Sequence, residues 1–551
     1  MKSRYEILRI TRRVWISLVP EVLGLTLFLG VFSLSFAVNL PELPRSYLDT
    51  TYVRPSGRTI AVQAGGDFQA ALNRARPGDE ITLEAGVTFV GPFTLPSKAG
   101  SGWITIRTSA PESSLPPPGT RVHPSFADSM PKLAAASGSV ITAAPGAHHY
   151  RFIGIEIRPM PGFFLNNLVT LGFADSSEGR LPSHIVFDRC YLHGDPIKGS
   201  RRGIALNGKS LAVIDSYLSD FKEVGAEAQA ILGWNGPGPF KIVNNYLEAA
   251  GENLRFGGGA DPAIVVLVPS DIESRGNHLY KPLSWRKGHP SFAGTPWTVK
   301  NIFELKNARR VLVEGNVLEH NWEHEQNGFA ILFTVRNQNG GAPWAVVEDV
   351  TFRRNIVRHS GSGVNILGRD DNFPSQQTKR ILIQDNLFED ISSAKWGGSG
   401  ILFQLLEGTS DVIIDHNTGL QDGHVILADG KSHTGFVFRN NIVPHAQYGI
   451  TGTGTGTGIP TLSRYFPGAI IQKNVFAGGE HAQYPKGNFF PASLERVKFV
   501  NRATGDYRLA YTSQAKKAGT DGKDLGADFA GLAEAIKARS QRLTQHSSYR
   551  P

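Results

Sequence analysis

Residues 298–338 of the chain, TVKNIFELKNARRVLVEGNVLEHNWEHEQNGFAILFTVRNQ, decide the fold. This stretch contains three short apolar runs, at residues 302–305, 310–314 and 329–333. The middle run ends in Gly315-Asn316, after which the chain turns and continues as a further strand. The order is strand, turn, strand, loop, strand, and the spacing leaves no room for a helix. The pattern predicts one coil of a solenoid, with Lys306 and Arg336 at corresponding places on adjacent coils.

The turn after the middle run recurs along the chain. Each copy joins an apolar strand to the next strand through Asn or a small residue, at Cys190, Ser216, Asn245, Asn277, Asn316, Asn355, Asn386, Asn417, Asn441 and Asn474. Recurring units with loops of variable length are typical of stacked coils that cannot bury their apolar faces alone. Asn suits the turn because it tolerates the left-handed conformation, and its amide can bond to the next Asn in the stack. Scattered Asn-rich loops of an ordinary β-sandwich are the alternative.

This repeat resembles the right-handed parallel β-helix of the pectin-lyase-like superfamily, over residues 58–528. The resemblance implies an all-β, single-stranded right-handed parallel β-helix of about 10–12 coils. Residues 67–75 predict an N-terminal capping helix with Asp67 at its N-cap. Residues 529–539 predict a C-terminal amphipathic helix, and we expect the polar tail to residue 551 to be disordered. The fold alone selects no activity, because many enzymes and some non-enzymes share it.

The first 37 residues predict an export signal. Five basic residues precede an apolar run over residues 22–37, and Ser35-Phe36-Ala37 fits a small-x-small cleavage site. The run is short for a membrane span, so we expect a secreted or periplasmic bacterial protein with no stable membrane insertion after cleavage. An uncleaved anchor is the alternative. Residues 38–57 are Pro-rich and predict a linker.

Composition and charge limit the possible partners. The formal net charge of +9 suits an anionic polymer. The single Cys190 excludes an internal disulfide and argues against a cysteine-built metal site. The sequence contains no phosphate-binding glycine loop and no nucleic-acid-binding signature. We therefore expect a monomer that binds an acidic polysaccharide and no nucleic acid.

In this type of solenoid the strand after the long loop faces a cleft. We expect apolar residues of that strand to point inward, namely Phe303, Leu305, Phe329, Ile331, Phe333, Val364, Ile366, Ile401 and Phe403. The residues expected to point outward are Lys300, Glu304, Lys306, Thr334, Arg336, Asn365, Arg369 and Gln404. The opposite parity would bury a column of charged groups in an apolar core at great cost.

Lys306 and Arg336 on consecutive coils predict a lyase for uronic-acid polymers. Such an enzyme neutralises the C6 carboxylate, removes the C5 proton and protonates the leaving oxygen. Lys306 is the candidate base and Arg336 its charge partner. The arrangement of Glu304, Lys306 and Arg336 is similar to that of the chondroitinase B and alginate lyase family, in which an acidic-then-Lys strand precedes an Arg on the next coil. The spacing of the acidic residues departs from that family, and solvated surface charges are the alternative for Lys306 and Arg336.

Further candidates line the expected cleft. Glu304, Asp370 and Asp371 are the carboxylates best placed for calcium or for acid/base catalysis. The loop of residues 282–297 adds His289 as a base or carboxylate ligand, Lys287 for substrate charge and Trp285 for sugar stacking. With Lys300, Asn365, Arg369 and Gln404 they complete the candidate substrate site. A glycoside hydrolase using Glu304, Asp370 and Asp371, or a non-catalytic carbohydrate-binding or adhesion solenoid, are the alternative functions.

Overall fold

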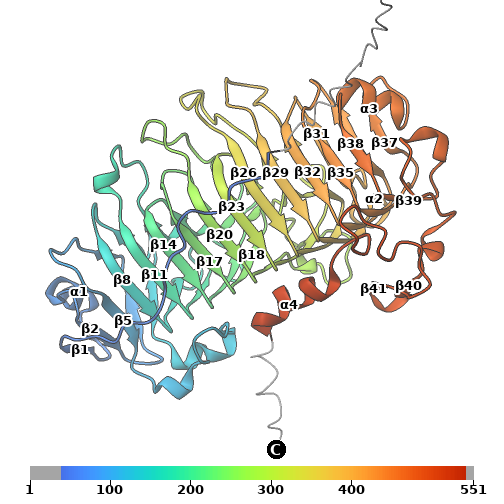
Figure 1. Ribbon diagram of the computed structural model, residues 1–551. Helices are drawn as coiled ribbons and strands as arrows, with labels where there is room; N and C mark the ends of the chain where they lie inside the picture. Colours follow the sequence, from blue (N-terminus) through green and yellow to red (C-terminus); the bar gives the residue numbers. More distant parts are fainter. Residues whose placement is uncertain (1–38, 541–551) are drawn as a thin grey trace, which may run out of the picture. The chain divides into compact units, whose positions relative to one another are not determined.

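The computed structural model describes residues 39–540, so the predicted export signal and the polar tail lie outside the described residues. Three long parallel sheets stacked coil upon coil form this part of the chain (Figure 1). Each coil contributes one strand to sheet A, turns at the Asn position into sheet B, and passes through a loop into sheet C. The prediction of an all-β right-handed parallel β-helix is confirmed.

Sheet A has 14 strands: β1 (Thr59–Val62), β2 (Glu80–Leu83), β5 (Ile104–Thr108), β8 (His148–Ile153), β11 (Ser183–Asp188), β14 (Lys209–Ile214), β17 (Phe240–Val243), β20 (Ser270–Arg275), β23 (Ala308–Glu314), β26 (Val347–Arg353), β29 (Lys379–Gln384), β32 (Ser410–Asp415), β35 (Val437–Arg439) and β38 (Ile470–Gln472). Sheet B has 13 strands: β3 (Thr88–Val90), β6 (Lys132–Ala135), β9 (Glu156–Pro159), β12 (Tyr191–His193), β15 (Tyr217–Phe221), β18 (Tyr246–Ala249), β21 (His278–Tyr280), β24 (Val317–Asn321), β27 (Ile356–Ser360), β30 (Leu387–Ile391), β33 (Thr418–Gln421), β36 (Ile442–Pro444) and β39 (Val475–Ala477).

Sheet C has 12 strands: β4 (Phe93–Leu95), β7 (Ile141–Ala143), β10 (Asn167–Leu171), β13 (Arg202–Leu206), β16 (Gln229–Gly233), β19 (Glu252–Phe256), β22 (Phe303–Leu305), β25 (Phe329–Thr334), β28 (Ser362–Leu367), β31 (Phe403–Leu406), β34 (His424–Asp429) and β37 (Gly449–Gly452). The antiparallel pair is β40 (Phe499–Asn501) and β41 (Asp506–Leu509). The α-helices are α1 (Phe68–Arg74), α2 (Ser393–Trp396), α3 (Ile459–Tyr465) and α4 (Phe529–Ser540). The 3-10 helices are η1 (Glu112–Ser114), η2 (Pro124–Ser129), η3 (Glu178–Arg180), η4 (Leu283–Trp285), η5 (His481–Gln483), η6 (Leu494–Val497) and η7 (Arg502–Thr504).

A continuous apolar core fills the space between the three sheets. Strand residues that point inward stack on those of the next coil, as Phe152 does on Phe187 with ring centroids 4.9 Å apart. The N-terminal end is covered by α1, which buries Phe68 and Leu72. The side chain of Asp67 accepts a hydrogen bond from the backbone N–H of Ala70 at 2.8 Å, so the predicted N-cap is confirmed. Within residues 39–540 no helix is long and apolar enough to cross a membrane.

A ladder of buried Asn side chains joins the turns between sheets A and B. Its members are Asn245, Asn277, Asn316, Asn355, Asn386, Asn417, Asn441, Asn474 and Asn488, and each amide donates to the side-chain oxygen of the next at 2.9–3.1 Å. The same oxygen also accepts the backbone N–H of the preceding Asn, as Asn355 does from Asn316 at 2.9 Å. Ser216 and the buried Cys190 extend the ladder toward the N-terminus.

The left-handed conformation is not taken by the ladder Asn itself, contrary to the expectation from sequence. It belongs to the residue before it, such as Arg354 with φ +53° or Gly315 with φ +67°. The reason is the geometry of the turn: the left-handed residue bends the chain from sheet A into sheet B, and the following Asn then points its amide along the stack.

The Pro-rich segment that was predicted to be a linker lies on the outer face of sheet A. From residue 39 to residue 57 it crosses the strands against the direction in which the coils advance (Figure 1). The backbone N–H of Glu42 donates to Asp349 on β26 at 3.0 Å, and Arg151 on β8 donates to the carbonyl oxygen of Thr50 at 2.8 Å. The segment is thus bound to several coils at once.

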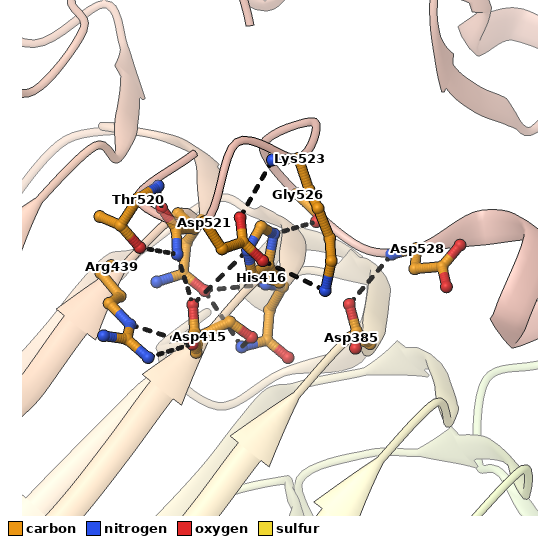
Figure 2. A network of polar contacts seen from close by, with 12 residues as sticks. Asp385, Asp415, His416, Arg439, Thr520, Asp521, Lys523, Gly526 and Asp528 are labelled. Carbon is orange, nitrogen blue, oxygen red and sulfur yellow. Dashed lines mark hydrogen bonds and ion pairs between the residues drawn. The ribbon is translucent and has the colours of Figure 1, made fainter. Parts of the chain in front are cut away.

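The chain returns after β41 along the turns at the C-terminal end of the solenoid. His416 donates through Nδ1 to the carbonyl oxygen of Gly526 at 3.2 Å, and its Nε2 lies 3.3 Å from Asp521 (Figure 2). The backbone N–H of Asp528 donates to Asp385 at 3.2 Å. These contacts lead the chain into α4, which packs apolar side chains against β30 and β41.

Removing one amide from the middle of the ladder should destabilise the protein strongly. In Asn355→Ala the buried backbone N–H and side-chain amide of Asn316 lose their acceptor, and we expect a loss of about 2–4 kcal/mol in the free energy of unfolding. Denaturant titration measures the loss. Asn355→Ser should lose less because Ser216 already works as a ladder member, and the exposed Asn73→Ala should change stability by about 0.5 kcal/mol or less. Equal stability of Asn355→Ala and wild type would contradict a stabilising role of the ladder.

Candidate functional site

Outward side chains of sheet C form a column along the solenoid. The registers of consecutive strands place Arg255, Glu304, Leu332, Asn365 and Gln404 side by side, on β19, β22, β25, β28 and β31. The residues that alternate with them point into the core, as expected for Phe303, Leu305, Ile331, Phe333, Val364, Ile366 and Phe403. The expected parity of the strand is therefore present at the centre of the sheet.

Phe329 and Ile401 depart from that parity. Both were expected to face the core, but they pack on the outer face of sheet C against Leu332 and the partly buried Leu427. Ala330 takes the inward position instead, because the alternation shifts by one residue where β25 begins. An apolar cluster thus interrupts the polar column between Glu304 and the next polar residue.

Six charged side chains gather on the outer face of sheet C, and we call them the ionic cluster: Glu227, Glu252, Arg255, Lys300, Glu304 and Lys306. Arg255 lies at its centre and is only 2% exposed. Its Nη1 contacts Glu227, and it lies 3.2 Å from Oε1 of Glu252 and 3.9 Å from Oε2 of Glu304. Three carboxylates therefore share one buried guanidinium, which makes the burial of their charges possible.

The two lysines stand at the rim of the ionic cluster. The Nζ of Lys306 lies 3.8 Å from Oε1 of Glu304, and Lys300 contacts the second oxygen of Glu227. Each lysine side chain keeps 14% of its surface exposed, and Glu227 keeps 31%. A ligand on this face would meet these three residues before the buried ones.

The surroundings of Glu304 and Glu227 shift the pKa values of the two carboxyl groups in opposite directions. Burial raises the pKa of Glu304 above its usual range, and the charges of Lys306 and Arg255 offset this only in part. Burial would also raise the pKa of Glu227, but the nearby charges of Arg255, Lys306 and Lys300 outweigh it and hold that pKa well below its usual range. The ionic cluster thus contains one carboxyl group whose protonated form is favoured, that of Glu304, and one whose ionised form is favoured, that of Glu227.

The sequence analysis did not include Arg255, Glu252 or Glu227. Their signal was the alternation in the segment Glu252-Asn253-Leu254-Arg255, which precedes the strand of Glu304 by one coil. A pairing of registers across the 46-residue connection from β19 to β22 would have found Arg255 beside Glu304, but this long connection, which contains β20 and β21, hides that register in the sequence.

Arg336 pairs with two residues that were proposed as metal ligands. Its backbone N–H donates to the carbonyl oxygen of Lys306 at 2.8 Å, so the two residues lie on adjacent coils as predicted. Its Nη1 donates to Asp370 at 2.8 Å and contacts Asp371. Asp370 also accepts the backbone N–H of Asn337 at 2.7 Å. The guanidinium of Arg336 is therefore engaged by the loop after β28.

The loop of residues 282–297 holds its three candidates apart from the ionic cluster. Trp285 is buried in an aromatic cluster with Trp322 and Trp396, so little of its ring is available to a sugar. His289 contacts Ser291 within the loop at 2.8 Å. Lys287 is exposed on the same loop.

The remaining candidates lie further along sheet C. Asn365 and Gln404 occupy the outward column, and within residues 39–540 the side-chain oxygen of Asn365 has no hydrogen-bond partner. Arg369 is exposed and donates to the carbonyl oxygen of Ser375 at 3.3 Å. Two polar groups are thus presented next to the apolar cluster, and Arg369 lies beyond them.

The three carboxylates proposed for calcium do not fit that ion as they are arranged. Glu304 lies between Arg255 and Lys306, while Asp370 and Asp371 both bind Arg336. Among residues 39–540 they belong to no group of three acidic or histidine ligands close enough to share one ion. A hard cation needs several oxygens converging on it without competing cations.

Arg255 should be essential for the stability of the ionic cluster near neutral pH. In Arg255→Met the buried Glu252 and Glu304 lose their counter-charge, and we expect a loss of about 3–5 kcal/mol in the free energy of unfolding. Burial already raises the pKa of Glu304, and without the charge of Arg255 that pKa rises further. The protonated form of Glu304 is then favoured in the folded state, so the loss should shrink as the pH falls below about 5.

Denaturant titration of wild type and Arg255→Met at neutral and acidic pH checks this expectation. The exposed Arg369→Met is the matched control and should change stability by about 0.5 kcal/mol or less at either pH. A deficit in Arg255→Met that grows on acidification would contradict the charge argument.

Comparison with known proteins finds similarity to solved structures alone. No model of a known protein family matches the chain. No curated protein matches its sequence. Solved structures with a similar fold include the catalytic unit of the thermostable GH87 α-1,3-glucanase from Streptomyces thermodiastaticus strain HF3-3, with a TM-score of 0.48, 12% identity, and coverage of 80% of this chain and 71% of that one.

Two polysaccharide lyases are also similar in fold. The PL6 family alginate lyase AlyGC has a TM-score of 0.45 and 13% identity, over 86% of this chain and 58% of its own. Pectate lyase Pel9A has a TM-score of 0.34 and 14% identity, over 85% of this chain and 96% of its own. At these identities the likeness concerns the architecture alone. The chain is a right-handed parallel β-helix protein, as its resemblance to the pectin-lyase-like fold predicts.

Proposed function

We propose that the protein binds an acidic polysaccharide on the outer face of sheet C and cleaves it by β-elimination. The observation that carries the proposal is the amine of Lys306, half-buried at the rim of the ionic cluster with its Nζ 3.8 Å from Glu304. A side chain that can exchange a proton stands there beside the exposed groups that a ligand would meet first.

The chemistry requires three steps at one uronic acid residue. The cation of Lys300 at the rim attracts the C6 carboxylate, which makes the C5 proton more acidic. Lys306 in its amine form takes the C5 proton as the C5–H bond breaks. The C4–O bond then breaks, a C4–C5 double bond forms, and Lys306, now an ammonium, returns the proton to the leaving oxygen. Glu304 acts as a positioning residue for Lys306, because its buried carboxyl does not reach the surface.

Polymer binding would extend from the ionic cluster toward the C-terminal coils. Consecutive strands of sheet C are about 4.8 Å apart, so the outward Asn365 and Gln404 follow the cluster along the solenoid axis. A chain running parallel to the axis would contact both residues.

Glycoside hydrolysis is the second candidate, and the opposed pKa shifts of Glu304 and Glu227 favour it. A protonated acid beside an ionised carboxylate is the pair that glycosidases use. Glu304 is only 1% exposed, however, so contact with a glycosidic oxygen would require it to move. Elimination at the more exposed Lys306 therefore stands first. Export to the periplasm or the medium is proposed from residues 1–37 of the sequence.

Purified protein mixed with pectate, alginate and glycosaminoglycans should release unsaturated uronides from one of them, followed by ultraviolet absorbance. Lys306→Ala should abolish the product, because the base is lost. Lys486→Ala, an exposed lysine near the C-terminal end of the solenoid, should match wild type. Reducing ends without the absorbance, lost in Glu304→Gln, would replace elimination by hydrolysis. Polymer retained without any product would identify a binding module.

Product formation should not depend on calcium. The carboxylates near Lys306 already have Arg and Lys partners, so added calcium has no free oxygen set to join. We expect equal initial rates with added calcium and with a calcium-selective chelator. A rate that falls in the chelator and returns with calcium would show that the ion pairs of Glu304 or of Asp370 and Asp371 rearrange on metal binding.

A further inference from the structure

A second polar centre lies on sheet B, away from the outer face of sheet C. Within residues 39–540, Glu319, His320 and His359 are the one group of three His, Cys, Asp or Glu residues whose ligand atoms all lie within 4.8 Å of one another. We call these residues the histidine cluster. The proposed cleavage uses none of these three residues, so a role of the histidine cluster is independent of that function.

The register of sheet B builds the histidine cluster. Glu319 pairs with Arg358 and Asn321 with Ser360, so His320 on β24 stands directly beside His359 on β27. Both histidines have left-handed backbones, with φ of +65° and +58°, and their side chains therefore leave the strand at the same corner of the coil. The ring centroids lie 5.3 Å apart.

Hydrogen bonds leave one nitrogen of each histidine as a free acceptor. Nδ1 of His320 lies 3.2 Å from the carbonyl oxygen of Lys281, which can only accept, so Nδ1 carries the proton. Nδ1 of His359 likewise donates to Asp390 at 2.9 Å. The lone pair is then on Nε2 in both rings, and Nε2 of His320 lies 3.8 Å from Oε1 of Glu319. A carbonyl or carboxylate that holds the far nitrogen is the arrangement that orients metal-binding histidines.

We propose that the histidine cluster binds a divalent transition-metal ion such as Zn²⁺. The ligands are Nε2 of His320, Nε2 of His359 and Oε1 of Glu319. Two imidazoles and one carboxylate suit zinc and its neighbours in the first transition row, whereas calcium prefers oxygen ligands alone.

The second oxygen of Glu319 is held by the protein. Oε2 accepts from Nε2 of His278 at 3.1 Å and from Arg358 at 3.1 Å. These two contacts fix the carboxylate and leave Oε1 for the ion. Arg358 adds a positive charge that weakens cation binding, while the carboxylate of Asp390 behind His359 acts in the opposite direction.

The site is closed on one side and open on the other. The indole of Trp396 lies against both imidazoles, with ring centroids 5.6 Å from each, and its N–H donates to Asp390 at 2.9 Å. A cavity of about 540 Å³, lined by His359, Asp390 and Tyr507 among others, opens beside His359. This cavity gives the ion a path of entry and leaves room for water or a further ligand on it.

Zinc binding by the full chain tests the proposal. Protein stripped of metal is dialysed against Zn²⁺ and its zinc content is measured, and Co²⁺ is titrated as a spectroscopic probe. We expect one zinc per chain, visible absorption bands with Co²⁺, and a higher Tm with Zn²⁺ than without it.

Three substitutions remove one ligand each. His320→Asn and His359→Asn keep an amide that can bond to Lys281 or Asp390 and tolerate the left-handed backbone, but they lack Nε2. Glu319→Gln keeps the shape of the carboxylate. Each should weaken zinc binding by about tenfold or more, and Asp390→Asn, which changes only the positioning partner of His359, by about 10- to 100-fold.

The exposed His123→Asn is the matched control and should bind zinc as wild type does. The Tm measured without metal shows whether each variant folds. If His320→Asn unfolds, His359→Asn provides the test, because His359 lies on the open side of the cluster. Absence of retained zinc in wild type would overturn the proposal. Equal zinc binding in His359→Asn and Glu319→Gln would do the same, because the ion would then be held by other surface histidines.

Discussion

The amide ladder between sheets A and B is the interaction on which the rest of the structure depends. Each ladder Asn uses one oxygen for two donors of the preceding coil and its amide for the next coil and for a strand carbonyl, as Asn355 does for Asn316, Asn386 and Val313. These groups are buried, so a shift of one residue in any turn would leave several of them unpaired. Loops of different lengths can therefore separate the coils while the turns remain in register.

Because the register of the strands is fixed, side chains at equivalent positions of successive coils are aligned in columns. On sheet C the column places Arg255 beside Glu304, and on sheet B a column places His320 beside His359 and then Asp390. Because neighbouring strands are about 4.8 Å apart, charges in one column interact strongly, and like charges must be balanced within it. The ionic cluster satisfies this condition with a single guanidinium between three carboxylates.

The sequence predicts the fold well because its signals are local. The alternation in residues 302–305 and the repeated Asn turns are readable from a few residues at a time, and so is the N-cap at Asp67. The site is harder because its contacts join residues far apart in the chain: Lys300 meets Glu227 across 73 residues, and Arg336 meets Asp370 across 34. Sequence analysis placed Lys306 and Glu304 on the outer face, but it could not show that Arg336 and its two aspartates neutralise one another. Burial of Trp285 by the tryptophans of other coils is hidden for the same reason.

The ionic cluster and the histidine cluster differ in how their charges are arranged. In the ionic cluster every buried charge lies beside an opposite charge, so the cluster as a whole attracts an added ion only weakly. Only the residues at its rim, Lys300, Lys306 and Glu227, face a ligand. In the histidine cluster Nδ1 of His320 is held by Lys281 and Nδ1 of His359 by Asp390, so Nε2 of each ring is turned toward the proposed ion. The first arrangement suits proton transfer beside a charged polymer, because its groups can exchange charge without a net change in the buried region. The second suits an ion, because the ligands meet it already oriented. One backbone register thus supports two kinds of chemistry on two faces, according to whether the column carries paired charges or neutral donors.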